Sequence, residues 1–183
     1  MWNFPIKDSC PGIPVNYHPG AFGFRGKHEH HSGVDLYCKE ETKVYACEEG
    51  IVICVEPFTG PKDGSPWWRD TDCVLVESKD AYNGIICYGE IKPIVKVGDI
   101  VTTETVIGIV EPVLLEGKER PDIPGHSRWM LHLEWYKKGR NKASTPWYLD
   151  MDQPDYLLDP TNMLLWNNEG FKKLPEWEAM VKT

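Results

Sequence analysis

The chain has 183 residues, of which 41% are hydrophobic and 26% charged, enough for one domain with an ordinary core. Its net charge of −8 argues against a nucleic-acid partner, because phosphate backbones are bound by basic surfaces. No apolar run is long enough to span a bilayer. The N-terminus lacks the basic and apolar stretches of an export signal, which indicates a cytoplasmic protein. Export by another route, or a signal outside this sequence, would place it in the cell envelope or outside the cell.

The cysteines show no C-x-x-C spacing, and several lie inside apolar, strand-like runs. This pattern favours small, reduced core residues over a disulfide framework, and a cysteine zinc site is less favoured still. The six are Cys10, Cys38, Cys47, Cys54, Cys73 and Cys87.

Residues 1–20 carry four prolines and two glycines without periodicity, which predicts an extended arm lying on the domain. From residue 21 onward, short β-rich runs follow one another between turns. They cover residues 43–47, 51–55, 73–77, 84–88, 94–97, 99–101 and 105–110. This pattern predicts an all-β, mainly antiparallel sandwich or barrel over residues 21–166.

Short helices are expected only near the C-terminus. Asp159 suits a helix cap and Pro160 the first helical position, so a helix is predicted over residues 160–166. A second short helix is predicted from Pro175 to Val181, within a tail that covers residues 167–183.

The segment from His28 to Leu36 contains three histidines and two carboxylates. Within it, His31 and Asp35 are separated by the flexible Gly33, so both side chains can turn toward one point. Imidazole and carboxylate are both zinc ligands, but two ligands are too few for a site.

A third candidate ligand lies in residues 129–136, where side chains alternate with a period of two. Leu131 and Leu133 are expected in a core, and His132 on the opposite, more polar face of the strand.

A series of short motifs follows one order over roughly residues 21–165. They are Phe22-Gly23-Phe24-Arg25, His31-Ser32-Gly33-Val34-Asp35-Leu36, Val44-Tyr45-Ala46, Glu49-Gly50-Ile51-Val52, Tyr88-Gly89-Glu90-Ile91, Lys96-Val97-Gly98-Asp99-Ile100-Val101, Ile107-Gly108, Met130-Leu131-His132-Leu133-Glu134 and Leu158-Asp159-Pro160. This series resembles the LytM/lysostaphin-type zinc endopeptidases. The resemblance implies a duplicated hybrid motif fold, in which an antiparallel β-sheet carries a groove.

The resemblance also implies that His31, Asp35 and His132 bind Zn²⁺. Three protein ligands leave a fourth position for water, as in catalytic rather than structural zinc sites. His28 and His30 match no motif and are expected to be solvated loop residues.

Two positions depart from the family pattern. Where the family has histidines that serve the bound water and the developing oxyanion, this chain has Glu90 and Met130. A carboxylate can act as a base, whereas a thioether can neither carry a proton nor donate a hydrogen bond.

His126 and Arg128 lie in the loop before the strand of His132 and are candidate replacements. His126 would act as an acid or oxyanion donor and Arg128 as a cation that helps hold substrate, with Tyr136 a weaker candidate. The alternative is a polar loop built of turn-forming residues.

The adjacent Trp67 and Trp68 lie in a loop rich in glycine and proline. Such residues suit stacking on a sugar or peptide substrate. They also suit cover for a small core under the loop, or contact with a protein partner.

Two functions follow from the resemblance. The first is a zinc hydrolase that cuts peptide bonds of peptidoglycan, with Glu90 as general base and His126 as oxyanion donor. The alternative is a catalytically inactive member that retains the metal and acts as a binding or regulatory protein.

Overall fold

The computed structural model describes residues 2–8, 10–80, 83–143, 147–166 and 172–176. Nine strands form one sheet in which all strand pairs are antiparallel, so the predicted all-β class is confirmed. They are β1 (Val34–Tyr37), β2 (Lys43–Tyr45), β3 (Gly50–Thr59), β4 (Thr71–Ser78), β5 (Ile85–Pro93), β6 (Ile100–Val101), β7 (Val106–Val110), β8 (Met130–Tyr136) and β9 (Leu157–Leu158).

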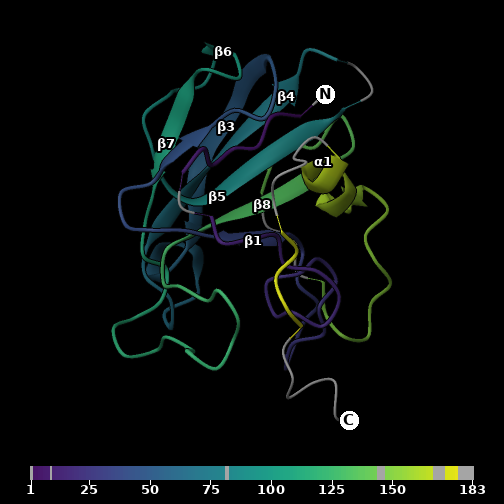
Figure 1. Cartoon of the computed structure of the whole chain (residues 1–183). Helices are drawn as coiled ribbons and strands as arrows, with labels where there is room; N and C mark the ends of the chain where they lie inside the picture. Colours follow the sequence, from purple (N-terminus) through teal and green to yellow (C-terminus); the bar gives the residue numbers. More distant parts are fainter. Residues whose placement is uncertain (1, 9, 81–82, 144–146, 167–171, 177–183) are drawn as a thin grey trace.

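The sheet runs in the order β1-β8-β5-β4-β3-β6 (Figure 1). β7 pairs with β2 and β5, and β9 pairs with β8. The central strand β5 changes partner along its length, since Gly89 lies opposite His132 of β8 while Ile91 lies opposite Val110 of β7. The residue at this change, Glu90, has a left-handed backbone with φ of 64°.

Strand β8 is buried on both faces. Leu131 and Leu133 lie in the main core as expected. The opposite face was expected to be the more polar one, yet Glu134 and Tyr136 are each only 1% exposed. These two polar side chains satisfy each other, because the Tyr136 hydroxyl donates a hydrogen bond to Glu134 Oε2.

Described residues among the first twenty pack against the sheet. Trp2, Phe4 and Ile6 are buried in the main core, and the amide of Tyr45 donates to the carbonyl of Pro5. Farther along, Ile13 forms a parallel bridge with Lys173 near the other end of the chain. The domain boundaries expected after residues 20 and 166 stay predictions.

The helix α1 (Thr161–Trp166) begins one residue later than predicted and ends where predicted, and Asp159 Oδ1 accepts the amide of Thr161 as its cap. Residues 177–181 of the second expected helix lie outside the described residues. No helix in the described part of the chain has the length and apolar character needed to cross a membrane.

The strand expected over residues 94–97 is wrong. This segment is a connection that ends in a turn, in which Asp99 Oδ2 accepts the amide of Lys96 and Gly98 has a φ of 94°. The β-branched residues there suggested a strand, but the turn at Gly98 takes the backbone away from a ladder.

Candidate metal centre

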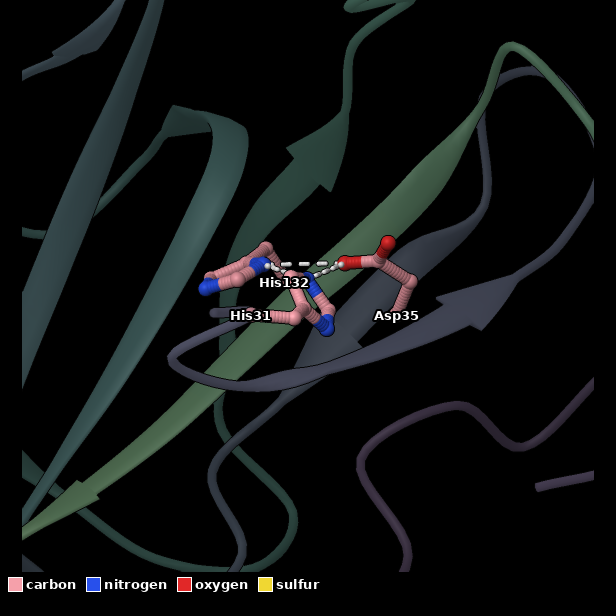
Figure 2. Close-up of side chains that lie close together, drawn as sticks. All are labelled: His31, Asp35 and His132. Carbon is pink, nitrogen blue, oxygen red and sulfur yellow. Dashed lines mark hydrogen bonds and ion pairs between the residues drawn. The ribbon is translucent and has the colours of Figure 1, made fainter. Parts of the chain in front are cut away.

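Two neighbouring strands bring the three expected ligands together. Asp35 of β1 lies directly opposite His132 of β8, and His31 precedes β1 by three residues. Asp35 Oδ1 is 2.8 Å from His132 Nδ1 and 3.1 Å from His31 Nε2. The two histidine nitrogens are 3.2 Å apart, and Figure 2 shows the three side chains converging.

These distances suit a zinc ion. Ligand atoms around a tetrahedral zinc, each about 2.0–2.1 Å from the metal, stand about 3.3 Å from one another. The three measured separations are slightly shorter than this value. Among the described residues, His31, Asp35 and His132 form the one group of three or more metal-ligating side chains with this spacing.

The backbone fixes which nitrogen His31 presents. Its Nδ1 lies 3.0 Å from the carbonyl oxygen of Ala21. Because a carbonyl only accepts, Nδ1 carries the proton, and the lone pair of Nε2 faces Asp35 and His132. The tautomer needed for metal binding is therefore set by the main chain.

His132 lies between two carboxylates. Its Nδ1 is 2.8 Å from Asp35 Oδ1 and its Nε2 is 3.3 Å from Glu134 Oε1 on the buried side. Burial lowers the pKa of His132, but Asp35 and Glu134 raise it well above its usual value. Burial alone would raise the pKa of Glu134, yet His132, Ser32 and Tyr136 lower it to about 2, so Glu134 is a buried carboxylate paired with a candidate ligand histidine.

Phe58, near the end of β3, covers the other side of His132. The ring centroids of the two residues are 5.4 Å apart. A side chain at Gly89 would meet the Phe58 ring at 2.4 Å, so glycine is needed there for Phe58 to lie flat on β5. The Phe58 ring therefore covers the candidate metal centre with apolar surface on this side.

Glu90 is buried beside the three ligands. Its Oε2 has no hydrogen-bond partner among the described residues, and its backbone is left-handed, which costs a non-glycine residue about 1–3 kcal/mol. Burial, and next the Asp35 carboxylate, raise the pKa of Glu90 to about 8, against the opposing effect of His132. An unpaired, strained acid of this kind is typical of functional sites.

Met130 has a packing environment. It is 6% exposed and belongs to a small apolar cluster with Tyr37, Val113, Leu114 and Leu174. The position where the resemblance implies a histidine is therefore filled by a buried apolar side chain that packs in this cluster.

His126 lies against Tyr37, with ring centroids 5.2 Å apart. Its Nδ1 accepts the amide of Arg120, and burial lowers its pKa. The ring of His18 also lies near Tyr37, with ring centroids 5.7 Å apart. His126 thus contacts Tyr37, which lies between it and the candidate metal centre, and does not contact the three candidate ligands themselves.

Arg128 is held by its own loop. Its guanidinium donates to the carbonyl of Leu114, lies 3.5 Å from Glu119 and stacks on Trp129. Tyr136, the weaker candidate, points to Glu134 inside the core.

Trp67 and Trp68 follow the 3₁₀ helix η1 (Pro61–Asp63) in the loop after β3. They are 62% and 37% exposed, so they do not cover a core. The loop begins two residues after Phe58 and is joined to the loop before β8, because the amide of Arg69 donates to the carbonyl of Val113.

His30, next to the candidate ligands in sequence, stacks on Trp147 and does not point to the candidate metal centre.

Four contributors to the centre were not identified from the sequence: His18, Ala21, Tyr37 and Phe58. Tyr37 had a local signal, because in a strand residue i+2 shares the face of Asp35. The others come from the arm and from β3, and no local pattern connects them to the ligands.

Comparison with solved structures identifies the fold. The catalytic domain of the antimicrobial peptidase lysostaphin from Staphylococcus simulans aligns over 82% of this chain and 89% of its own, with 18% identity and a TM-score of 0.50. A solution structure of lysostaphin aligns over 92% of this chain and 60% of its own, with 16% identity and a TM-score of 0.53.

A zinc-containing peptidase from Vibrio cholerae aligns over 84% of this chain, with 21% identity and a TM-score of 0.50. This chain spans 40% of that longer protein. No protein-family model and no curated protein matches the sequence. The chain therefore has the lysostaphin-type peptidase fold.

Proposed function

We propose that this protein is a zinc-dependent hydrolase of the LytM/lysostaphin type that cuts peptide bonds of peptidoglycan. One observation carries the proposal: His31, Asp35 and His132 meet within 2.8–3.2 Å, with the lone pair of His31 turned inward. The carbonyl of Ala21 also fixes His31 in the tautomer that a metal ligand needs.

Zinc, when bound by these three residues, polarises a carbonyl oxygen and lowers the pKa of a water. Around it, the chain excludes bulk water with the Phe58 ring and holds His31 in the tautomer that presents Nε2. These features leave one side of the cluster for a substrate.

Glu90 is the proposed general base. Its carboxylate takes a proton from the attacking water as the new C–O bond forms, and gives this proton to the amine nitrogen as the C–N bond breaks. A bound cation beside it favours the ionised carboxylate, which offsets the effect of burial. His126 stays a predicted acid or oxyanion donor.

Trp67, Trp68 and Arg128 are proposed to contact substrate. The two exposed indoles lie on a loop tied to the loop of Arg128 through Arg69 and Val113. Flat, exposed aromatic rings bind sugars and extended peptides by stacking. The substrate would then lie along the two loops with its scissile bond at the metal centre.

A second candidate is a binding or regulatory protein that keeps the metal without turnover. The packing of Met130 in an apolar cluster favours it, because no proton donor stands at this position. Under this alternative, Trp67 and Trp68 would bind a wall fragment or a protein partner.

The test starts with metal analysis of the purified protein before and after zinc reconstitution. Hydrolysis of purified peptidoglycan is then followed for wild type, His132→Ala, Glu90→Gln and the surface control Glu77→Gln. We expect one zinc per chain, lost in His132→Ala, and turnover lost in Glu90→Gln but kept in Glu77→Gln.

Absence of zinc after reconstitution would contradict the site. Zinc binding without turnover on several wall types would support the second candidate.

A further inference from the structure

Tyr37 has a hydroxyl without a structural partner. Three of the described tyrosines are buried, and two of them use the hydroxyl in the core: Tyr88 accepts the amide of Cys47, and Tyr136 donates to Glu134. The Tyr37 hydroxyl makes no hydrogen bond to any described residue. The Tyr37 side chain as a whole is only 2% exposed, but its Oη is not one of the fully buried polar atoms, so the hydroxyl is open to a ligand or solvent.

The strand places this hydroxyl beside the metal centre. Tyr37 is two residues after Asp35 on β1, so both side chains leave the same face of the strand. A side chain at Gly20 would meet Tyr37 Oη at 2.9 Å and Asp35 Cβ at 3.0 Å. Tyr37 Oη and the Cβ of Asp35 thus both lie next to one backbone position, Gly20.

Two imidazoles hold the ring in place. His18 and His126 lie at centroid distances of 5.7 and 5.2 Å. His18 is itself fixed, because Nε2 donates to the carbonyl of Pro124 and Nδ1 accepts the amide of Gly20. Below the ring is Met130, the cross-strand partner of Tyr37. Because the Tyr37 ring is already held in one position, its hydroxyl can donate to a ligand without a further loss of side-chain conformational freedom.

We propose that Tyr37 donates a hydrogen bond to an oxyanion held at the His31–Asp35–His132 site. For the proposed peptidase, on which this role rests, the oxyanion is the scissile carbonyl oxygen as it gains negative charge. No proton is transferred in this role, since the phenol donates and keeps its hydrogen. Tyr37 of β1 thereby supplies the hydrogen-bond donor that Met130 of β8, which has no donor group in its side chain, cannot supply.

The test compares Tyr37→Phe with wild type in the zinc-loaded protein, with Tyr45→Phe as matched control. Tyr45 is a partly exposed tyrosine of β2, with Lys7 over its ring, and lies outside the centre. Zinc affinity and melting temperature are measured first, and we expect both to be unchanged in Tyr37→Phe. Inorganic phosphate, a tetrahedral oxyanion, is then titrated by calorimetry.

We expect phosphate to bind the zinc-loaded wild type and Tyr45→Phe alike, and at least about tenfold more weakly to Tyr37→Phe. On peptidoglycan, kcat should fall about 100-fold in Tyr37→Phe with KM unchanged. Equal phosphate affinity in wild type and Tyr37→Phe would overturn the donor role, as would zinc-loaded wild type that binds no phosphate.

Failure of the proposed function gives a different result. If the wild type binds zinc and phosphate but shows no turnover, the proposed hydrolase function is wrong. Loss of phosphate affinity in Tyr37→Phe would still support Tyr37 as a hydrogen-bond donor to the oxyanion. A wild-type protein that binds no zinc would overturn both.

Discussion

Gly33 lies directly against the imidazole of His132. A Cβ at this position would stand 2.6 Å from His132 Nε2 and 2.5 Å from the carbonyl oxygen of Leu133. No side chain fits there without moving either the ligand ring or strand β8. The glycine between His31 and Asp35 therefore serves close approach, and not only the flexibility of the segment.

Gly33→Ala should weaken zinc binding by about 10–100-fold, because the methyl group displaces His132 and its contact with Glu134. The unfolding free energy should fall by about 1–3 kcal/mol from overpacking. Competition with a chromogenic chelator measures the first and urea unfolding the second.

Gly64→Ala is the matched control, since a Cβ at Gly64 meets no atom within 4 Å. Its left-handed backbone costs about 1 kcal/mol of stability, but zinc affinity should be unchanged. Equal zinc affinities for Gly33→Ala and wild type would show that His132 is not a ligand.

Glu134→Gln should also weaken zinc binding by about 10–100-fold, because an amide holds the His132 tautomer less firmly than a carboxylate. Chelator competition is the measurement. The control is Glu77→Gln, in an exposed ion pair with Lys138, which should leave the affinity unchanged. If the two variants bind zinc equally well, Glu134 has no orienting role.

Glu90→Gln should stabilise the metal-free protein as the pH rises. The pKa of Glu90 is raised from 4.5 to about 8, so the folded state holds a proton that the unfolded state has lost between these values. Wild type therefore loses stability from about pH 5 to about pH 8, by at most about 1.4 kcal/mol per pH unit from this group. Glutamine removes that loss.

Urea unfolding of both proteins at several pH values, with chelator present, measures the difference. It should grow toward pH 8 and vanish near pH 4.5. A difference that does not change with pH would mean that Glu90 ionises as easily in the fold as in the unfolded chain.

Replacing Trp67 and Trp68 together by alanine should weaken binding to insoluble peptidoglycan by about 5–150-fold, from stacking of about 0.5–1.5 kcal/mol per ring. Stability should change by less than about 1 kcal/mol, because both rings are exposed. Co-sedimentation with purified walls is the measurement.

Trp166→Ala is the control, since this tryptophan is 79% exposed on α1. Equal co-sedimentation of the double variant and wild type would show that the indoles of Trp67 and Trp68 do not contribute to substrate binding.

The fold class was accessible from the sequence because its signals are local. Period-two alternation and short β-rich runs predicted the sheet. The ligand set His31, Asp35 and His132 came from the resemblance to a family and stays a prediction, although the fold brings these three side chains together. The polar face expected for β8 failed for a non-local reason. Glu134 and Tyr136 pair inside the core, and pairing of this kind leaves no trace in residue type.

The surroundings of the ligands were not accessible for the same reason. The carbonyl of Ala21 carries no side-chain signal, and the left-handed backbone of Glu90 arises where β5 exchanges β8 for β7. The clamp of His18 and His126 on Tyr37 joins three segments distant in sequence. Such features depend on tertiary structure alone.

The arm that begins the chain has a thermodynamic consequence for the metal centre. The carbonyl of Gly20 accepts the amide of Asp35, that of Ala21 accepts His31, and His18 ties the arm to Pro124. If zinc binds here, docking of the arm and metal binding are linked equilibria, and each strengthens the other by the same factor. Protection of the arm from proteolysis would then report metal occupancy without any substrate.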